Sequence, residues 1–258
     1  MLEAENITVR IGDKILLDKV SAQFLPGKLN LIIGPNGAGK STLMKVLSRQ
    51  MTNYEGKVMY QSVDSKTLRD KNLARMRAVL SQNIDLAFPL KVWEIVMMGR
   101  YPHFAGAPKQ VDEEACIAAL KFFEVEEMAE RNYLTLSGGE RQRVHFARVL
   151  TQLWYPLPDQ GRYLLLDEPL TFLDIHYQFQ FMHKVIELLK QKDLVVVGVV
   201  HDLNLAARFG DVIHLIQNGQ LVASGSKEEV LTEKNIEGAF QLKPIIYREE
   251  RGLRLFFE

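Results

Sequence analysis

The sequence has few features of an extracellular, disulfide-bonded or nucleic-acid-binding protein. It contains one cysteine, Cys116, so no disulfide can form within the chain and no cysteine cluster can hold a metal. Its 32 Lys and Arg residues are balanced by 32 Asp and Glu residues, whereas a general nucleic-acid binder usually carries a basic excess. We therefore expect no nucleic-acid partner. Cys116 lies in a helix-like stretch and is expected to be a small buried apolar residue.

Long apolar segments are also missing. A membrane-spanning helix needs about 20 mostly apolar residues, and the most apolar run, Leu194–Val200, ends at His201 and Asp202. The acidic start, Met1–Asn6, is not followed by a long apolar stretch, which predicts no secretory signal. We expect a cytoplasmic chain, either free or attached to a membrane-spanning protein.

The apolar pattern predicts strands at both ends of the chain and helices in the middle, from about residue 85 to 152. Short apolar runs bounded by Gly, Pro or Asn indicate strands, and apolar residues at helical spacing indicate helices. Expected strands are Ile7–Arg10, Ile15–Leu17, Leu29–Ile33, Gly56–Tyr60, Tyr163–Leu166, Leu194–Val200, Val212–Ile216, Leu221–Ala223, Pro244–Tyr247 and Leu253–Phe257. Expected helices are residues 40–50, Val92–Gly99, Asp112–Phe123, Glu140–Leu153, Tyr177–Lys190 and a short one capped by Ser226 and Glu229.

A phosphate-binding loop follows the expected strand Leu29–Ile33. Residues 34–42 read G-P-N-G-A-G-K-S-T and match G-x-x-x-x-G-K-[ST] between a strand and a helix. Glycines let the backbone approach a phosphate closely, and the amides at the helix N-terminus favour an anion. Lys40 can reach the β- and γ-phosphates, and the Ser41 hydroxyl can ligate Mg²⁺. The alternative is a glycine-rich turn that holds no ligand.

Two carboxylates end the second apolar strand. Asp167 and Glu168 follow Tyr163–Leu166, and ligands of open parallel sheets lie beyond the carboxyl ends of the strands. Asp167 is expected near Mg²⁺, and Glu168 near the γ-phosphate, where it can act as general base or position water. The alternative is a solvated acidic pair at a strand end.

A second glycine motif discriminates among nucleotide-binding proteins. Ser137 and Glu140 form an S-x-x-E capping box, which predicts a helix starting at Ser137. Gly138 and Gly139 leave the first amides of that helix uncovered, which favours a second anion site. An ordinary capped helix is the alternative.

Taken together, these motifs resemble those of the ATP-binding subunit of an ABC transporter over nearly the whole chain. Residues 34–42 resemble its Walker A loop, 136–140 its signature motif and 163–168 its Walker B strand. Gln82 resembles the Q-loop glutamine that touches Mg²⁺, Leu173-Asp174 the end of the D-loop, and His201 the switch histidine that contacts the γ-phosphate.

The resemblance implies an α/β fold of the P-loop NTPase type, with a RecA-like parallel-sheet core, an antiparallel β subdomain and an inserted helical subdomain. It places the core at about residues 1–84 and 156–258 and the helical subdomain at about 85–155. It implies ATP and Mg²⁺ as cofactors and Glu168, His201 and Gln82 as catalytic residues. The implied magnesium ligands are Ser41, Gln82 and Asp167. The implied nucleotide-binding residues are Gly34, Pro35, Asn36, Gly37, Ala38, Gly39, Lys40, Ser41, Thr42, Ser137, Gly138, Gly139 and Asp174.

The family also implies the assembly. Two such subunits face head to tail, so that ATP on the loop of one is closed over by Ser137, Gly138 and Gly139 of the other. Two transmembrane permease subunits and, indirectly, an extracytoplasmic substrate-binding protein complete an importer. The subunit is then peripheral on the cytoplasmic face of the membrane. The apolar stretch Leu86–Val92 suggests the docking groove for the permease, with core packing as the alternative.

Two stretches of the sequence indicate the cargo. Met98–His103 resembles a stretch of importers of iron chelates, haem and cobalamin, and the loop Gln152–Arg162 resembles the haem branch. We therefore predict a haem importer ATPase, in which His103 and His145 do not bind cargo.

Ile11 stands where an aromatic ring often covers adenine, and residues 170–174 read L-T-F-L-D where the D-loop usually has Ser-Ala-Leu-Asp.

Other functions stay open on the sequence. The same machinery could import a ferric siderophore or cobalamin, or serve a non-transport cassette such as cluster assembly. A P-loop kinase is a third class, but it does not explain Leu136–Glu140.

Overall fold

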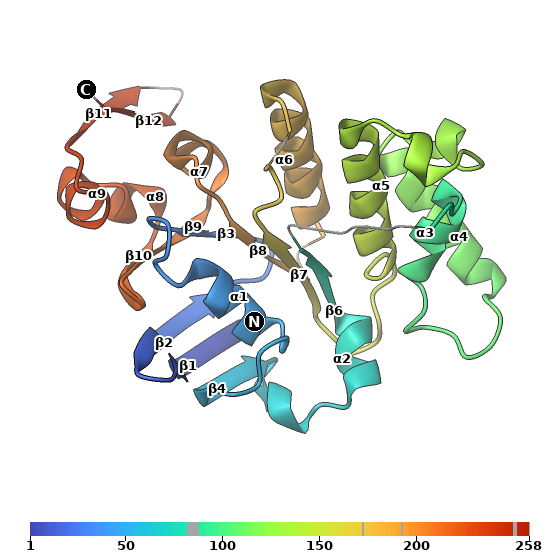
Figure 1. Cartoon of the computed structure of the whole chain (residues 1–258), viewed down its shortest axis with the longest axis horizontal. Coiled ribbons are helices and arrows are strands. Elements are labelled where there is room, and N and C mark those ends of the chain that lie inside the picture. The colour runs from blue at the N-terminus through green and yellow to red at the C-terminus, as the bar shows by residue number, and fades with distance from the viewer. Residues whose placement is uncertain (82–87, 172, 192, 250–251, 258) are drawn as a thin grey trace.

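A six-stranded, largely parallel sheet forms the centre of this computed structural model, which describes residues 1–81, 88–171, 173–191, 193–249 and 252–257 (Figure 1). Its strand order is β10-β9-β3-β8-β7-β6, and only β10 pairs antiparallel, with β9. The strands are β3 (Leu29–Ile33), β6 (Arg77–Leu80), β7 (Arg162–Asp167), β8 (Leu194–Val199), β9 (Val212–Gln217) and β10 (Gln220–Gly225).

The inner strands of this sheet are buried on both faces. Leu29, Leu31 and Ile33 of β3 point into one apolar cluster, and Ile32 points into another on the opposite face. Successive side chains of a strand alternate between faces, so a strand covered on both sides is apolar throughout. This explains why the expected strand Leu29–Ile33 was readable from its unbroken apolar run and is confirmed in full.

An antiparallel sheet and two helices cover one face. The sheet has the order β2-β1-β4-β5 and consists of β1 (Leu2–Ile11), β2 (Lys14–Phe24), β4 (Glu55–Tyr60) and β5 (Val63–Asp64). Apolar residues of this sheet, of α1 (Lys40–Leu47) and of α2 (Asp70–Met76) share one cluster with the central sheet. Strands β1 and β2 run further than the expected Ile7–Arg10 and Ile15–Leu17, because backbone pairing extends across polar positions.

Helices cover the opposite face and continue beyond it to one end of the molecule (Figure 1). They are α3 (Val92–Met98), α4 (Gln110–Phe122), α5 (Gly138–Thr151), α6 (Ile175–Leu189) and α7 (Leu203–Phe209), with short 3₁₀ turns at Glu126–Met128 and Tyr133–Thr135. A further 3₁₀ turn, Ser65–Thr67, follows β5. Cys116 of α4 is fully buried, as expected for a small apolar residue. Among the described helices, none is long and apolar enough to cross a bilayer.

The C-terminal segment ends in the expected hairpin. After α8 (Lys227–Val230) and α9 (Glu233–Phe240), strands β11 (Pro244–Glu249) and β12 (Gly252–Phe257) pair with each other. The Asn204 side chain of α7 both donates to and accepts from the backbone of Leu255, at 3.0 and 2.8 Å. These bonds hold β12 on α7. Elements α2, β5, β6, α7 and α9 were not expected, because each is short and lacks a clear apolar period.

Asn30 illustrates how the centre of the sheet is held together. This fully buried side chain accepts from Leu25 N at 2.8 Å and donates to the carbonyls of Leu25, Lys28 and Val196, each at 3.0 Å. Asn30→Leu removes all four of these hydrogen bonds, of which the one to Val196 O is fully buried, so we expect the free energy of unfolding to fall by about 1–3 kcal/mol. The midpoint and slope of urea denaturation measure it. Asn53→Ala, at an exposed position, is the control and should unfold like the parent.

Candidate functional site

Three loops that carry the predicted site residues meet at one edge of the central sheet. The phosphate-binding loop follows β3, His201 follows β8, and Asp167 and Glu168 end or follow β7. Strand β8 lies between β3 and β7, and all three are parallel. Their carboxyl ends therefore lie side by side, which is where open α/β sheets bind ligands.

The phosphate-binding loop needs glycine at particular positions. Gly34 has φ +148°, and a Cβ there would lie 2.0 Å from the carbonyl oxygen of Ile216. Gly39 has φ +106°, and a Cβ there would lie 2.8 Å from Leu16 O. At both positions, the clash of a Cβ with the backbone and the positive φ exclude residues other than glycine. The loop consequently curls tightly into α1, which starts at Lys40.

The Lys40 side chain lies inside this loop. Its Nζ donates to the carbonyls of Gly34 at 2.8 Å and Pro35 at 2.9 Å. Burial lowers the pKa of Lys40, and the charges of Glu168 and Asp167 oppose that shift. The ammonium group is thus placed among the loop carbonyls and close to both carboxylates, where it can also reach an anion cradled by the loop.

The turn between β9 and β10 is hydrogen-bonded to the phosphate-binding loop. Gly219 N donates to Ala38 O at 2.9 Å, and Asp18 N of β2 donates to Gly219 O at 2.8 Å. The expected Asn218-Gly219 hairpin is confirmed, with positive φ at both residues. Its position against the loop could not be read from its local pattern.

Asp167 presents a carboxylate that its surroundings leave incompletely satisfied. The Ser41 hydroxyl bonds to it, but its Oδ1 is buried and has no hydrogen-bond partner among the described residues. Burial raises the pKa of Asp167, and the neighbouring Glu168 charge raises it further, whereas the Ser41 bond, Lys45 and Lys40 lower it. A buried carboxylate oxygen next to a hydroxyl is the donor set that a hard cation prefers.

Glu168 and His201 contact each other across the strand edge. His201 Nε2 lies 2.8 Å from Glu168 Oε1, and the Glu168 side chain is mostly buried whereas that of His201 is partly exposed. Glu168 has φ +52°, an uncommon left-handed conformation for a residue other than glycine. Such backbone outliers cluster at functional sites, where surrounding structure enforces them.

The second glycine motif is confirmed as a helix start. Ser137 is the N-cap of α5, its Oγ accepts from Glu140 N at 3.4 Å, and Glu140 Oε2 accepts from Ser137 N at 2.7 Å. The Ser137 bonds are the main cause of the lowered pKa of Glu140. A Cβ at Gly138 would meet nothing within 4 Å, so the first turn of α5 is open to a ligand or partner.

This motif and the phosphate-binding loop of the same chain are apart. Helix α5 lies with α3 and α4 at one end of the molecule, whereas α1 lies beneath the sheet nearer the other end (Figure 1). In the described ranges, Ser137, Gly138 and Gly139 have no hydrogen bond to residues 34–42. One chain therefore brings together the loop, the carboxylates and His201, but not the signature residues.

Asp174 has a role that its side chain shows directly. It is the N-cap of α6, and its Oδ1 accepts from Tyr177 N at 3.1 Å. The preceding backbone is held by neighbouring glutamines: Gln178 Nε2 donates to Leu173 O at 3.0 Å, and Gln142 Nε2 of α5 donates to Pro169 O at 3.1 Å. Gln142 thus links the signature helix to the loop after Glu168, a contact that the sequence did not reveal.

Some predicted residues lie outside the described part of the chain. Gln82 and Phe172 are among them, as are residues 86 and 87 of the expected docking stretch. Of the remainder of that stretch, Phe88 is 70% exposed, whereas Val92 is fully buried in α3 and belongs to the core. Within this stretch, Phe88 is therefore exposed as a docking residue would be, whereas Val92 packs in the core. Ile11 is 61% exposed at the end of β1, open to contact from outside.

The described histidines form no metal site. No group of three His, Cys, Asp or Glu side chains suited to a metal ion occurs in the described ranges. His145 is buried, with Nε2 2.6 Å from the Tyr133 hydroxyl, and burial, with the charges of Arg148 and Arg141, lowers its pKa to about 4. His103 Nε2 lies 2.8 Å from Gln152 O. Both side chains are engaged within the fold.

Comparisons with known proteins agree with this geometry. The ABC transporter family model matches residues 17–171. The hemin import ATP-binding protein HmuV of Gloeobacter violaceus is 43% identical over 97% of this chain and 91% of that protein. HmuV of Pseudomonas fluorescens is 41% identical over 98% of this chain and 97% of that protein.

Solved structures show the same fold. A metal-chelate type ABC transporter in an inward-facing conformation matches with a TM-score of 0.81 and 24% identity, over 100% of this chain and 96% of that one. A dimeric bacterial ABC transporter cassette matches with a TM-score of 0.74 and 27% identity, over 88% and 99% of the two chains. With its motifs, fold and relatives in agreement, the chain belongs to the ABC transporter family as an ATP-binding, ATP-hydrolysing subunit.

Proposed function

We propose that two copies of this chain drive hemin uptake through a membrane-embedded permease by binding and hydrolysing ATP between them. The observation that carries the cargo is the 43% identity to a hemin import ATP-binding protein over 97% of the chain. The observation that carries the mechanism is that the loops after β3, β7 and β8 converge, while the signature residues stay apart.

The separation of the phosphate-binding loop from the signature residues within one chain supports an ATP-bridged pair. Across the described ranges, Ser137, Gly138 and Gly139 make no hydrogen bond to residues 34–42 of their own chain, yet the first turn of α5 is open and its amides favour an anion. A second copy, facing the first, would place this turn over the nucleotide on residues 34–42. Asp174, at the start of α6 and near the same face, is proposed to lie in this interface. A related cassette has been solved as a dimer.

Glu168 is proposed as the residue that activates water. Its carboxylate stands beside the phosphate-binding loop and can accept a proton from the attacking water as the γ-phosphate departs. His201, 2.8 Å from Glu168, orients that carboxylate and is within reach of the γ-phosphate. Lys40 neutralises charge on the phosphates, and Ile11 supplies apolar contact for adenine.

Asp167 and Ser41 fit a bound Mg²⁺. Asp167 Oδ1, which is buried and has no hydrogen-bond partner in the part of the chain that the structure describes, and the Ser41 hydroxyl are hard oxygen donors that meet at the edge of the loop. Gln82 is proposed to complete the set. When bound, the ion neutralises charge on the β- and γ-phosphates.

Replacing Asp167 by asparagine tests this assignment. A carboxyl whose pKa is raised in the folded state binds its proton more tightly there, so its ionisation destabilises the fold at every pH above both pKa values. Asp167→Asn removes that cost, and we expect the free energy of unfolding near neutral pH to rise by about 0.5–2 kcal/mol. The gain should shrink as the pH is lowered, and magnesium-dependent ATP hydrolysis should be lost.

The measurements are urea unfolding from pH 4 to 8 and phosphate release with and without Mg²⁺. Asp193→Asn would be a poor control because Asp193 pairs with Arg162. Asp13→Asn, at the exposed β1–β2 turn, is the matched control and should change neither quantity. Retained magnesium-dependent turnover in Asp167→Asn would contradict the assignment.

The rest of the assembly follows from the same proposal. We propose that residues 85–155 form a helical subdomain, that residues 1–84 and 156–258 form the nucleotide-binding core, and that the exposed Phe88 region contacts the permease. The pair then lies on the cytoplasmic face of the membrane, and an extracytoplasmic substrate-binding protein delivers hemin to the permease from the other side.

Uptake of labelled hemin in cells lacking this chain tests the cargo. We expect uptake to be lost, to be restored by the parent gene, and not to be restored by Glu168→Gln. Uptake of cobalamin and of a ferric siderophore is measured in the same cells. Loss of either of those with hemin uptake intact would reassign the cargo within the same class of importer, and loss of none would contradict an import role.

A further inference from the structure

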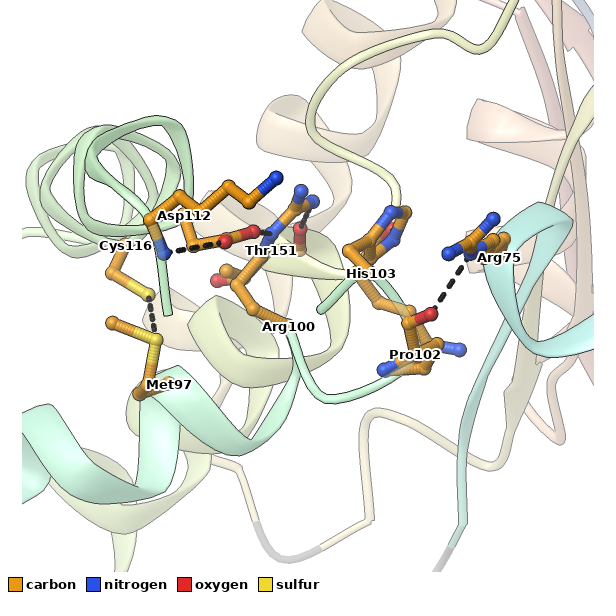
Figure 2. A network of polar contacts seen from close by, with 10 residues as sticks. Arg75, Met97, Arg100, Pro102, His103, Asp112, Cys116 and Thr151 are labelled. Atoms are coloured by element: carbon orange, nitrogen blue, oxygen red, sulfur yellow. Dashed lines mark hydrogen bonds and ion pairs between the residues drawn. The ribbon is translucent and has the colours of Figure 1, made fainter. Parts of the chain in front are cut away.

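The side chains of Arg100 and His103, in the segment Met98–His103, are bonded to other parts of the fold. Arg100 is buried between α3, α4 and α5 (Figure 2). Its Nε donates to Asp112 Oδ1 at 2.9 Å, and its Nη1 donates to Thr151 O at 2.9 Å. The guanidinium therefore joins the first turn of α4 to the last turn of α5.

His103 binds the next carbonyl of the same helix. Its Nε2 lies 2.8 Å from Gln152 O, and since a carbonyl can only accept, the imidazole donates from Nε2–H. Burial lowers the pKa of His103, with a further contribution from the Arg100 charge. The last carbonyls of a helix have no partner within it. Arg100 and His103 supply partners for two of those at the end of α5.

Gln152 carries the connection across to the central sheet. Its side-chain amide donates to Ala74 O, near the end of α2, and to Arg77 O, in the first residue of β6, at 2.8 Å for the latter. In parallel, Arg75 Nε donates to Pro102 O at 2.8 Å (Figure 2). Two sets of bonds thus join the segment 98–103 and the end of α5 to α2 and β6.

We propose that Arg100, His103 and Gln152 are positioning residues that fix the orientation of α5, and hence of the signature residues, relative to β6. Helix α5 has 14 residues, about 20 Å of rigid rod at 1.5 Å per residue. Its C-terminal end is held by these bonds, and its N-terminal end presents Ser137, Gly138 and Gly139. A small rotation at the held end therefore displaces the signature residues.

The inference rests on the proposed ATP-bridged pair and deepens it. Strand β6 ends at Leu80, two positions before Gln82, and the Phe88 region proposed to meet the permease follows further along the chain. Bonds between β6 and the base of α5 would let a movement there reach the signature residues as motion of one rigid element. The segment Met98–His103 then contributes to coupling within the ATPase subunit, and it needs no contact with cargo.

The test measures ATP-dependent dimerisation of the full chain in a Glu168→Gln background, by analytical ultracentrifugation. We expect His103→Ala to weaken dimerisation about tenfold or more, since small displacements at a distance can have effects of this size. Affinity of the single chain for ATP should stay within about twofold of the parent, because residues 34–42 are untouched. His103→Gln, whose amide can donate to Gln152 O, should recover most of the loss.

Gln152→Glu provides an independent variant. It cannot donate to Ala74 O or Arg77 O, but it keeps the backbone carbonyl that His103 binds, and it should weaken dimerisation in the same direction. His183→Ala, at an exposed histidine of α6, is the matched control and should dimerise like the parent. Thermal unfolding of every variant is recorded alongside.

The possible outcomes separate the claims. Dimerisation of His103→Ala and Gln152→Glu at the parental level would overturn the positioning role. So would a parallel loss of ATP affinity and thermal stability that His103→Gln does not recover, because that pattern marks general destabilisation. Failure of the Glu168→Gln parent itself to dimerise with ATP would instead contradict the proposed function, and the inference with it.

Discussion

Glu168→Gln is expected to lower the rate of ATP hydrolysis by about 10²–10⁴-fold while ATP binding persists. Glutamine has nearly the same size as glutamate and can still bond to His201, so the uncommon backbone conformation at this position should survive. It cannot accept the proton of an attacking water. The pair of subunits should consequently remain closed on ATP, because hydrolysis is what separates them.

Two measurements check this result. Phosphate release is followed for the chain assembled with its permease, and nucleotide affinity is measured for the chain alone by titration with a fluorescent ATP analogue. Glu187→Gln, at an exposed position of α6, is the control and should hydrolyse ATP like the parent. Turnover by Glu168→Gln at the parental rate would remove Glu168 from the reaction.

Gly138→Asp is expected to abolish hydrolysis without harming its own chain. A Cβ at Gly138 meets nothing within 4 Å, so the fold accommodates the side chain. A negative charge in the first turn of α5 even favours the helix, by about 0.3–1 kcal/mol. In the proposed pair, the same carboxylate would face the triphosphate held by the partner, and repulsion between like charges would prevent closure.

This result is recognised by properties of the single chain that stay unchanged while properties of the pair are lost. Thermal stability and the ATP affinity of the single chain should match the parent, whereas ATP-dependent dimerisation and hydrolysis should fall at least about a hundredfold. Gly238→Asp, at another glycine with open space, on α9, is the matched control and should retain hydrolysis. Full activity of Gly138→Asp would show that the signature residues do not close over nucleotide.

Local features of the site could be predicted because they depend on neighbouring residues. The glycines of residues 34–42 need the left-handed backbone that only glycine adopts freely, and Ser137 and Glu140, three positions apart, cap the start of a helix. The hairpin at Asn218-Gly219 follows from the same kind of local preference. Each of these was readable from a few consecutive residues.

Other parts could not be predicted, for a physical reason that concerns distance along the chain. That β8 lies between β3 and β7, so that His201 meets Glu168, depends on strand pairing between remote segments. Gln152 bonds to Ala74 and Arg77, more than seventy positions earlier. Strand β6 and helices α2 and α9 are short, and packing against the rest of the molecule stabilises them more than their own sequence does.

The amino-acid sequence by itself determined the chemistry of this protein: a loop for phosphates, a carboxylate pair, a histidine and a glycine-rich helix start, because backbone conformation and side-chain reactivity are local properties. The tertiary structure alone decided which of these groups share one site. It joined the first three at one sheet edge and held the helix start apart, because only the packing of distant strands and helices sets those positions.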